Sequence, residues 1–168
     1  MPNLYIITGP AGVGKSTVSK KLAESKNKSV LIEGDEIYHH VVGSYIPAWK
    51  EGNHLELFWN ICFDMIDTYL TSGYDVVFNY IVTLDAYDKI KERFKIYKTK
   101  FLVLVVDEKT ILLRDKQRPE DCQMKERCVK LLNNFKNTKY EKDYFLDTTN
   151  LTVQETVNKI ENDNKFLI

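Results

Sequence analysis

Short runs of hydrophobic residues alternate along this chain with longer segments in which hydrophobic residues recur every three or four positions. The first pattern is typical of β-strands and the second of amphipathic helices. In VVF and FLVLVV the hydrophobic residues follow one another directly, which indicates strands covered on both faces, as in a parallel sheet. The pattern predicts strands over residues 4–8, 29–33, 75–80, 101–106 and 144–146, and helices over 15–25, 54–72, 85–98, 109–115, 124–137 and 153–161.

Alternation of strands and helices predicts the α/β class, in a single domain that spans residues 1–168. Two stretches interrupt the alternation, at residues 34–52 and 116–123. Both are expected beyond the carboxyl ends of strands, where open α/β sheets bind their ligands. The basic residues between positions 89 and 100 indicate either an anion-binding patch or a charged helix face in solvent.

The composition fits one compact domain. Of the 168 residues 43% are hydrophobic, and 24 Lys and Arg balance 24 Asp and Glu. This composition can form a real core, which excludes a disordered chain, a collagen and a coiled coil. A net charge of zero argues against sequence-independent nucleic-acid binding, which depends on a basic surface. We therefore expect a small-molecule partner and no nucleic acid.

The three cysteines, at positions 62, 122 and 128, cannot all pair and show no CxxC spacing. This spacing argues against a disulfide framework or a thiolate zinc site, and a reducing cytoplasm fits best. The longest stretch without Asp, Glu, Lys or Arg, residues 37–49, is shorter than the roughly 18 residues of a membrane helix. The hydrophobic run at 4–7 is too short for a signal peptide. We expect a cytoplasmic protein without membrane contact.

Residues 9–16, GPAGVGKS, match the phosphate-binding pattern G-x-x-x-x-G-K-[ST]. Glycines allow successive backbone N–H groups to point into one concavity, and the following helix adds the positive end of its dipole. The Lys can reach the β- and γ-phosphates, and the Ser hydroxyl can bind Mg²⁺. A plain glycine turn is the alternative, but the motif follows a hydrophobic strand and begins a helix, as the mechanism requires. We expect the nucleotide to be bound by Gly9, Ala11, Gly12, Val13, Gly14, Lys15, Ser16 and Thr17.

Four features follow one another along the chain: the glycine loop at residue 9, Gly34-Asp35 after the second strand, an Arg-bearing segment near residue 115, and YFLDTTNLT before the last helix. With them the chain resembles, over nearly its whole length, the small P-loop kinases of the nucleoside-monophosphate-kinase-like superfamily. This group includes gluconate kinase, shikimate kinase and chloramphenicol phosphotransferase, and the chain is most similar to a poorly characterised bacterial subgroup. Only the glycine loop is highly specific by itself.

The resemblance implies a three-layer P-loop NTPase fold whose five strands form a parallel sheet in the order 2-3-1-4-5. It also implies a short lid at residues 114–127 and an acceptor-binding segment at residues 34–55. The implied activity is Mg²⁺-dependent transfer of the γ-phosphoryl group of ATP to a hydroxyl of a sugar, a sugar acid or an antibiotic-like molecule. We expect a monomer or a homodimer.

Other P-loop proteins fit less well. A GTPase needs DxxG after the third strand and NKxD for guanine, and neither pattern is present. Nucleic-acid motors are usually larger and more basic. The main alternative to a kinase is a nucleotide-binding regulatory protein with little or no kinase activity.

The resemblance assigns the role of catalytic base to Asp35, because gluconate kinase and chloramphenicol phosphotransferase place an Asp just past the second strand. A carboxylate there can orient the acceptor hydroxyl and take its proton. The alternative is that Asp35 only caps the helical turn that begins near Glu36. His39, Tyr45 and Trp49 follow in the acceptor segment and can supply hydrogen bonds and a stacking wall, or simply pack.

Departures from the family narrow the acceptor. The chain lacks the His-Pro that gluconate kinase tends to place soon after Gly-Asp, the Gly-Gly-Gly of shikimate kinase, and the Asp-Gly-aromatic-Pro-Arg turn of nucleotide kinases. The third strand ends at Asn79, where related kinases often carry an Asp that holds a magnesium-bound water. An amide can accept a hydrogen bond from that water without adding negative charge. Ser16, as a metal ligand, and Asp35 are then expected to provide more of the Mg²⁺ environment.

The predicted lid contains Arg114 and Arg118, four residues apart and therefore expected on one helix face. One can stack on adenine while the other reaches the phosphates, and Arg118 is the candidate catalytic Arg. The alternative is surface ion pairing with Asp115, Glu120 and Asp121. Cys122 and Cys128 flank this region, and we expect an inert structural role for both.

The segment at residues 147–152, DTTNLT, lies where this superfamily binds adenine. Asn150 is the candidate side chain for the purine edge. Thr152 can in addition cap the last helix, and both roles are compatible.

Overall fold

Five parallel strands form one sheet in the order β2-β3-β1-β4-β5, as the computed structural model shows for residues 1–120 and 123–168. The predicted strand order is confirmed. In the sheet, Ile6 of β1 lies beside Phe78 of β3 on one side and beside Phe101 of β4 on the other. The strands are β1 (Asn3–Thr8), β2 (Ser29–Glu33), β3 (Asp75–Asn79), β4 (Lys98–Val105) and β5 (Phe145–Asp147).

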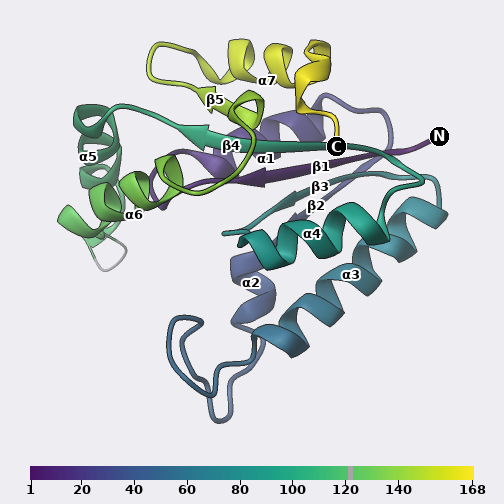
Figure 1. The fold of residues 1–168 in the computed structure, drawn as a ribbon, viewed down its shortest axis with the longest axis horizontal. Coiled ribbons are helices and arrows are strands. Elements are labelled where there is room, and N and C mark those ends of the chain that lie inside the picture. The colour runs from purple at the N-terminus through teal and green to yellow at the C-terminus, as the bar shows by residue number, and fades with distance from the viewer. Residues whose placement is uncertain (121–122) are drawn as a thin grey trace.

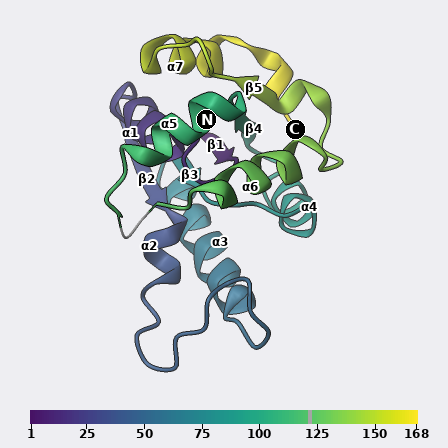
Figure 2. The ribbon, with the colours of Figure 1, turned by 90° about the vertical axis from the view of Figure 1, so that its left-hand side faces the viewer.

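Helices cover both faces of the sheet and give three layers (Figure 1). Helices α1 (Lys15–Glu24) and α7 (Val153–Asn162) pack together on one face, and α3 (Leu55–Thr71) and α4 (Leu84–Arg93) lie on the other. Figure 2 looks onto the carboxyl end of the strands, where α5 (Glu108–Lys116), α6 (Glu126–Lys136) and the short α2 (Gly34–Tyr38) are found. After α2 the chain makes a long projecting loop before α3.

The core is the sheet itself. Leu4, Ile6 and Ile7 of β1 and the run 101–104 of β4 are completely buried, which explains why their hydrophobic residues do not alternate with polar ones. Phe94, directly after α4, and Phe166, in the segment after α7, are also completely buried in this core. A rigid sheet of this kind fixes the positions of the loops at its carboxyl edge.

Two predicted element boundaries are wrong near β4. The helix predicted to reach residue 98 ends at Arg93, and the strand begins at Lys98 because Lys98 pairs with Asn3 of β1. Lys100 is 3% exposed, although the sequence placed it in a basic stretch read as an anion patch or a solvated helix face. Its ammonium donates to three backbone carbonyls at the end of α7, at 2.8, 2.8 and 2.9 Å.

Two further findings concern the rest of the chain. Cys62 and Cys128 are free and buried, which agrees with the structural role expected of Cys128, whereas Asp121 and Cys122 lie outside the described residues. Within the described ranges no helix has both the length and the hydrophobicity needed to cross a membrane.

Candidate nucleotide and acceptor site

The loop between β1 and α1 adopts a backbone conformation that favours glycine. Gly9, Gly12 and Gly14 have φ angles of 143°, 83° and 102°. A Cβ on Gly9 would also lie 2.4 Å from the carbonyl oxygen of Leu104 in β4, so a larger residue does not fit. Gly14 is the N-cap of α1, and the helix therefore points its unpaired N–H groups and positive dipole end at this loop.

Lys15 bends back over the loop that precedes it. Its ammonium donates to the carbonyl oxygens of Gly9 and Pro10, both at 3.1 Å. Burial lowers the pKa of Lys15 to about 8, with Asp35 opposing this change and Arg118 adding to it. Phosphate oxygens would provide the negative charge that this half-buried ammonium lacks.

Ser16 faces a carboxylate that the sequence reading missed. Its hydroxyl donates to Oε2 of Glu33, the last residue of β2, at 3.0 Å. Hydroxyl and carboxylate oxygens are the hard donors that Mg²⁺ prefers, so this pair fits the metal of a nucleotide complex. The signal for Glu33 was present in the sequence, since it is an acid at the carboxyl end of a predicted strand.

Asn79 lies beside Glu33 in the sheet register and is 2% exposed. Its Nδ2 has no hydrogen-bond partner among the described residues, and the side chain does not line the cavity described below. The expected contact of Asn79 with substrate or with a metal-bound water stays a prediction.

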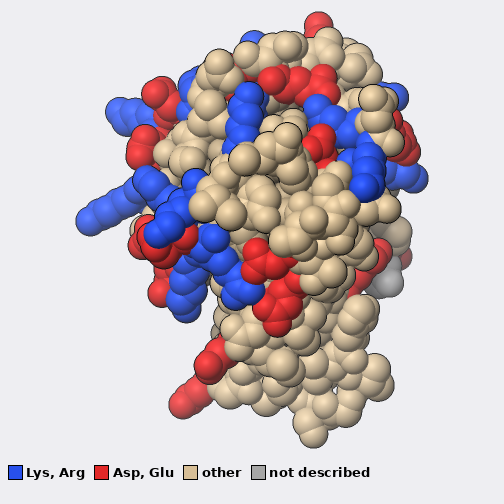
Figure 3. All heavy atoms as spheres, turned by 90° about the vertical axis from the view of Figure 1, so that its right-hand side faces the viewer, with Lys and Arg blue, Asp and Glu red and all other residues tan. Residues whose placement is uncertain are grey.

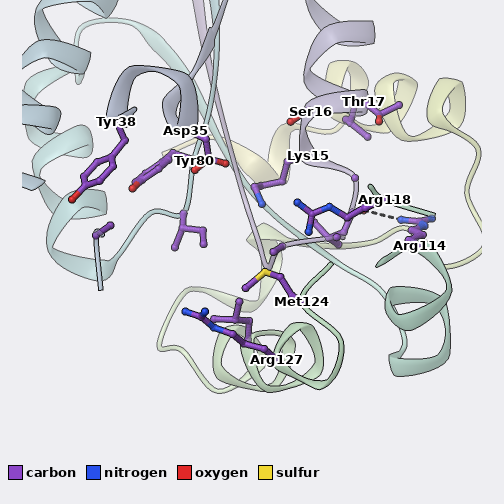
Figure 4. A pocket seen from close by; sticks show the side chains of 18 of the residues that line it. Lys15, Ser16, Thr17, Asp35, Tyr38, Tyr80, Arg114, Arg118, Met124 and Arg127 are labelled. Atoms are coloured by element: carbon purple, nitrogen blue, oxygen red, sulfur yellow. Dashed lines mark hydrogen bonds between the residues drawn. The ribbon is translucent and has the colours of Figure 1, made fainter. Parts of the chain in front are cut away.

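Asp35 is positioned by a tight contact beneath it. A Cβ on Gly34 would lie 2.7 Å from Cβ of Tyr80, so only glycine lets the first turn of α2 pack against Tyr80. The N-cap of α2 is Glu33, and the alternative in which Asp35 caps this turn is therefore wrong. The Asp35 side chain lines the same cavity as Lys15, and both point into it in Figure 4.

His39 and Tyr45 of the acceptor segment form a stacked pair, with ring centroids 5.5 Å apart and an interplanar angle of 19°. Nδ1 of His39 contacts the carbonyl oxygen of Asp35 at 2.6 Å, and Nε2 contacts the Tyr45 hydroxyl at 3.2 Å. Trp49 is 68% exposed, and its ring meets the guanidinium of Arg127 in α6 at 4.8 Å. The segment therefore reaches across to the lid.

The two lid arginines do not share a helix face, because α5 ends at Lys116 and Arg118 lies beyond its C-cap. Arg114 donates to the carbonyl oxygens of Val13 at 2.7 Å and Thr148 at 3.2 Å. It thereby ties the glycine loop to the segment after β5. Arg118 is a separate cation that lines the cavity.

Asp115 holds the lid together. The sequence indicated only that it could form a surface ion pair with a lid arginine. It is 2% exposed, and its carboxylate accepts N–H bonds from Met124 at 2.9 Å and Lys125 at 2.7 Å, and a weaker bond from Arg118 at 3.4 Å. Burial alone would raise the pKa of Asp115, but these donors outweigh it and hold the pKa below its usual value. Lys125 has a φ of 52° and a ψ of −130°, a conformation strained for any residue with a Cβ.

One cavity of about 1080 Å³ joins these groups (Figure 4). Gly9, Asn79 and Asn150 are not part of its lining, and Asn150 is exposed. Lining residues that the sequence reading missed include Tyr38, Tyr80, Met124 and Arg127. Predicted site residues that do line it are Ala11, Gly12, Val13, Gly14, Lys15, Ser16, Thr17, Asp35, His39, Tyr45, Trp49, Arg114 and Arg118.

The segment after β5 forms the opposite end of the cavity, with Thr148, Leu151 and Val153 in its wall. Thr152 caps α7 in a capping box with Glu155, as predicted. The hydrophobic side chains here suit the face of a planar base.

Comparisons with known proteins agree with this geometry. A sequence profile of the family described as "AAA domain" matches residues 4–137. No curated protein sequence matches the chain significantly.

Solved structures share the fold at low sequence identity. The tunicamycin resistance protein of Deinococcus radiodurans is 16% identical with a TM-score of 0.69, over 95% of this chain and 94% of that one. A gluconokinase from Sinorhizobium meliloti 1021 is 18% identical with a TM-score of 0.68, over 95% and 89%. The APS kinase of Mycobacterium tuberculosis is 14% identical with a TM-score of 0.66, over 96% of both chains.

Proposed function

Because the chain belongs to the AAA domain family and has a kinase-like P-loop fold, we propose that it transfers the γ-phosphoryl group of ATP to a hydroxyl of a small molecule. One observation carries the proposal: a single cavity joins the glycine loop with Lys15 and Ser16 to the carboxylate of Asp35. Nucleotide binding by itself requires no carboxylate in the cavity besides the phosphate-binding groups. Phosphoryl transfer to an alcohol uses one, because a carboxylate can orient the hydroxyl and take its proton.

The loop N–H groups and Lys15 bind the phosphates in this proposal, and the hydrophobic wall near Leu151 takes the base. Arg118 offsets negative charge that develops on the phosphoryl group during transfer. Ser16 and Glu33 would hold Mg²⁺, which when bound neutralises phosphate charge.

Asp35 orients the acceptor hydroxyl and takes its proton. The hydroxyl oxygen forms a bond to the γ-phosphorus as the bond between that phosphorus and the bridging oxygen breaks, and ADP leaves with the electron pair. The products are the phosphate ester, ADP and the proton on Asp35, which then passes to water.

The test is a comparison of two neighbouring carboxylates of α2, Asp35 in the cavity and Glu36 outside its lining. Initial rates of ADP formation are measured with sugars, sugar acids and hydroxylated antibiotics as acceptors. Asp35→Asn should lower kcat roughly a hundredfold or more with little change in ATP affinity, because a base acts on the acceptor. Glu36→Gln should leave kcat unchanged. A fully active Asp35→Asn enzyme would remove Asp35 as the base.

The nucleotide half of the proposal is tested separately by titration calorimetry. Lys15→Ala should abolish tight ATP binding while circular dichroism shows an unchanged fold. Unchanged ATP affinity together with unchanged activity would contradict the phosphate site.

Asn79 favours a second candidate, a nucleotide-binding regulator with little turnover. It places an uncharged amide at the end of β3, beside Glu33. ATP binding without turnover of any acceptor would favour this reading. Gain of activity and of Mg²⁺ affinity in Asn79→Asp would show that the missing carboxylate is the reason.

We also propose that the protein acts in the cytoplasm on a small molecule, as a monomer or a homodimer, without a nucleic-acid or membrane partner. Size-exclusion chromatography with light scattering tests the oligomeric state.

A further inference from the structure

The part of the cavity lining that comes from α2, from the loop after it and from the end of β3 includes four aromatic rings. Tyr38 and Tyr45 come from α2 and the loop after it, Trp49 from the same loop, and Tyr80 follows β3. We call these four side chains the aromatic wall. Tyr38 packs edge to face on Tyr45, with ring centroids 5.9 Å apart. Leu55, Ile81 and Leu131 extend this lining with apolar side chains.

Cations are scarce at this end of the cavity. Lys15 and Arg118 belong to the phosphate side, and Arg114 is bonded to two backbone carbonyls. Arg127 is the basic residue that α6 adds to the lining, and its guanidinium lies over the ring of Trp49 at 4.8 Å. A sugar acid or a sugar phosphate requires donors or cations aimed at its own charge.

Both ring nitrogens of His39 are engaged inside the acceptor segment. Its Nδ1 faces the carbonyl oxygen of Asp35, which can only accept, so Nδ1 carries a proton. Its Nε2 contacts the hydroxyl of Tyr45, which can donate or accept. Both nitrogens are used in holding the acceptor segment, and neither is left to pair with an anion.

The chain segment that supplies Tyr38, Tyr45 and Trp49 also lacks charged side chains. Residues 37–49 contain no Asp, Glu, Lys or Arg. Figure 3 looks from the side away from the carboxyl ends of the strands, and the lobe that projects at the bottom shows almost no charged side chains on that face.

We infer that the acceptor is an uncharged alcohol that carries a ring with an apolar face, such as an aromatic glycoside or a hydroxylated antibiotic, and that the ring stacks on the aromatic wall. This inference rests on the proposed phosphoryl transfer and narrows its acceptor. It separates the neutral class from sugar acids and sugar phosphates, which the fold by itself would also accommodate.

The test uses binding, so that it stands apart from turnover. The chain has two Trp residues, and Trp59→Phe leaves Trp49 as the single fluorophore in the aromatic wall. Its quenching is titrated with four probes: p-nitrophenyl β-glucoside, methyl β-glucoside, gluconate and glucose 6-phosphate. Displacement of the aryl glucoside by each other probe, followed by calorimetry, corrects for direct absorbance.

The aryl glucoside should bind roughly two- to tenfold more tightly than the methyl glucoside, because an aromatic contact contributes free energy beyond the area it buries. Gluconate and glucose 6-phosphate should bind most weakly. Trp49→Ala, measured by calorimetry, should remove the preference for the aryl compound and leave the methyl glucoside unchanged.

Three results would overturn the inference: no aryl glucoside binding at millimolar concentration, equal or tighter binding of an anionic probe, or gluconate binding that Arg127→Gln abolishes. The last would show that Arg127 pairs with an anionic acceptor. Tight aryl binding without ADP formation would support the acceptor class and contradict phosphoryl transfer, so the two proposals fail separately.

Discussion

Replacing Asp115 by Asn tests whether one buried carboxylate holds the lid. Oδ2 of Asp115 accepts from the backbone N–H groups of Met124 and Lys125, and Oδ1 accepts from Met124 at 3.1 Å and from Arg118 at 3.4 Å. Asn keeps one oxygen and replaces the other by NH₂. Whichever way the amide turns, an N–H group then faces an N–H donor, and the charge is lost.

The cost follows from the bonds counted. A hydrogen bond to a charged group contributes about 1.5–3 kcal/mol, and the two backbone bonds are the shortest of the set, so we expect a loss of about 3 kcal/mol in the free energy of unfolding. For a chain of this length about 1 kcal/mol changes Tm by about 2–4 °C. Asp115→Asn should therefore lower Tm by roughly 6–12 °C.

Urea denaturation and calorimetry of both proteins measure the change. The matched control is Asp107→Asn on the same helix, because Asp107 is the N-cap of α5 and Asn caps a helix about as well as Asp. A Tm within about 2 °C of the parent for Asp115→Asn would refute the argument, since one lost charged bond alone should exceed that.

The effect should also depend on pH. The pKa of Asp115 lies below its usual value in the folded protein, so its stabilising contribution is present above the pKa of the unfolded chain and is lost as pH falls through the folded pKa. The difference in stability between the parent and Asp115→Asn should be constant near neutral pH and should shrink below about pH 4. A difference that grows on acidification would contradict the assignment.

Three further variants follow from single contacts, each measured by urea denaturation. Lys100→Met should cost about 3–5 kcal/mol, because three carbonyls at the end of α7 lose their buried donor; a cost under about 1 kcal/mol would contradict this. Lys125→Gly should stabilise the chain by about 1 kcal/mol by relieving the strained backbone, and a loss would show that the strain is absent. Gly34→Ala should cost about 1–3 kcal/mol, because its Cβ would meet Tyr80 at 2.7 Å, and Gly43→Ala, with no atom near that position, is the control.

Much of the fold followed from local pattern. The strands are short, hydrophobic on both faces and separated by amphipathic helices, so their existence and class did not depend on long-range information. The glycine loop was found for the same reason, since positive φ and close approach restrict the residues allowed at Gly9, Gly12 and Gly14. The strand order came from the family resemblance, and the structure confirmed it.

What the tertiary structure decided concerns polar groups whose partners are distant in the sequence. In the sequence, Lys100 is one of several lysines that could all be solvated. In the structure, the pairing of β4 with β1 places its ammonium at the carbonyl groups that end α7. In the sequence, Asp115 resembles a surface acid. In the structure, its carboxylate accepts from the backbone N–H of Met124, nine residues later.

The metal-binding and acceptor parts of the cavity were decided in the same way. Glu33 and Ser16 are 17 positions apart, and Trp49 meets Arg127 only after α6 is placed beyond the sheet. A sequence pattern records the period of each element and the conformational demands of its turns. The partner of a buried charge depends on which elements the sheet sets side by side, and burial makes that partner obligatory.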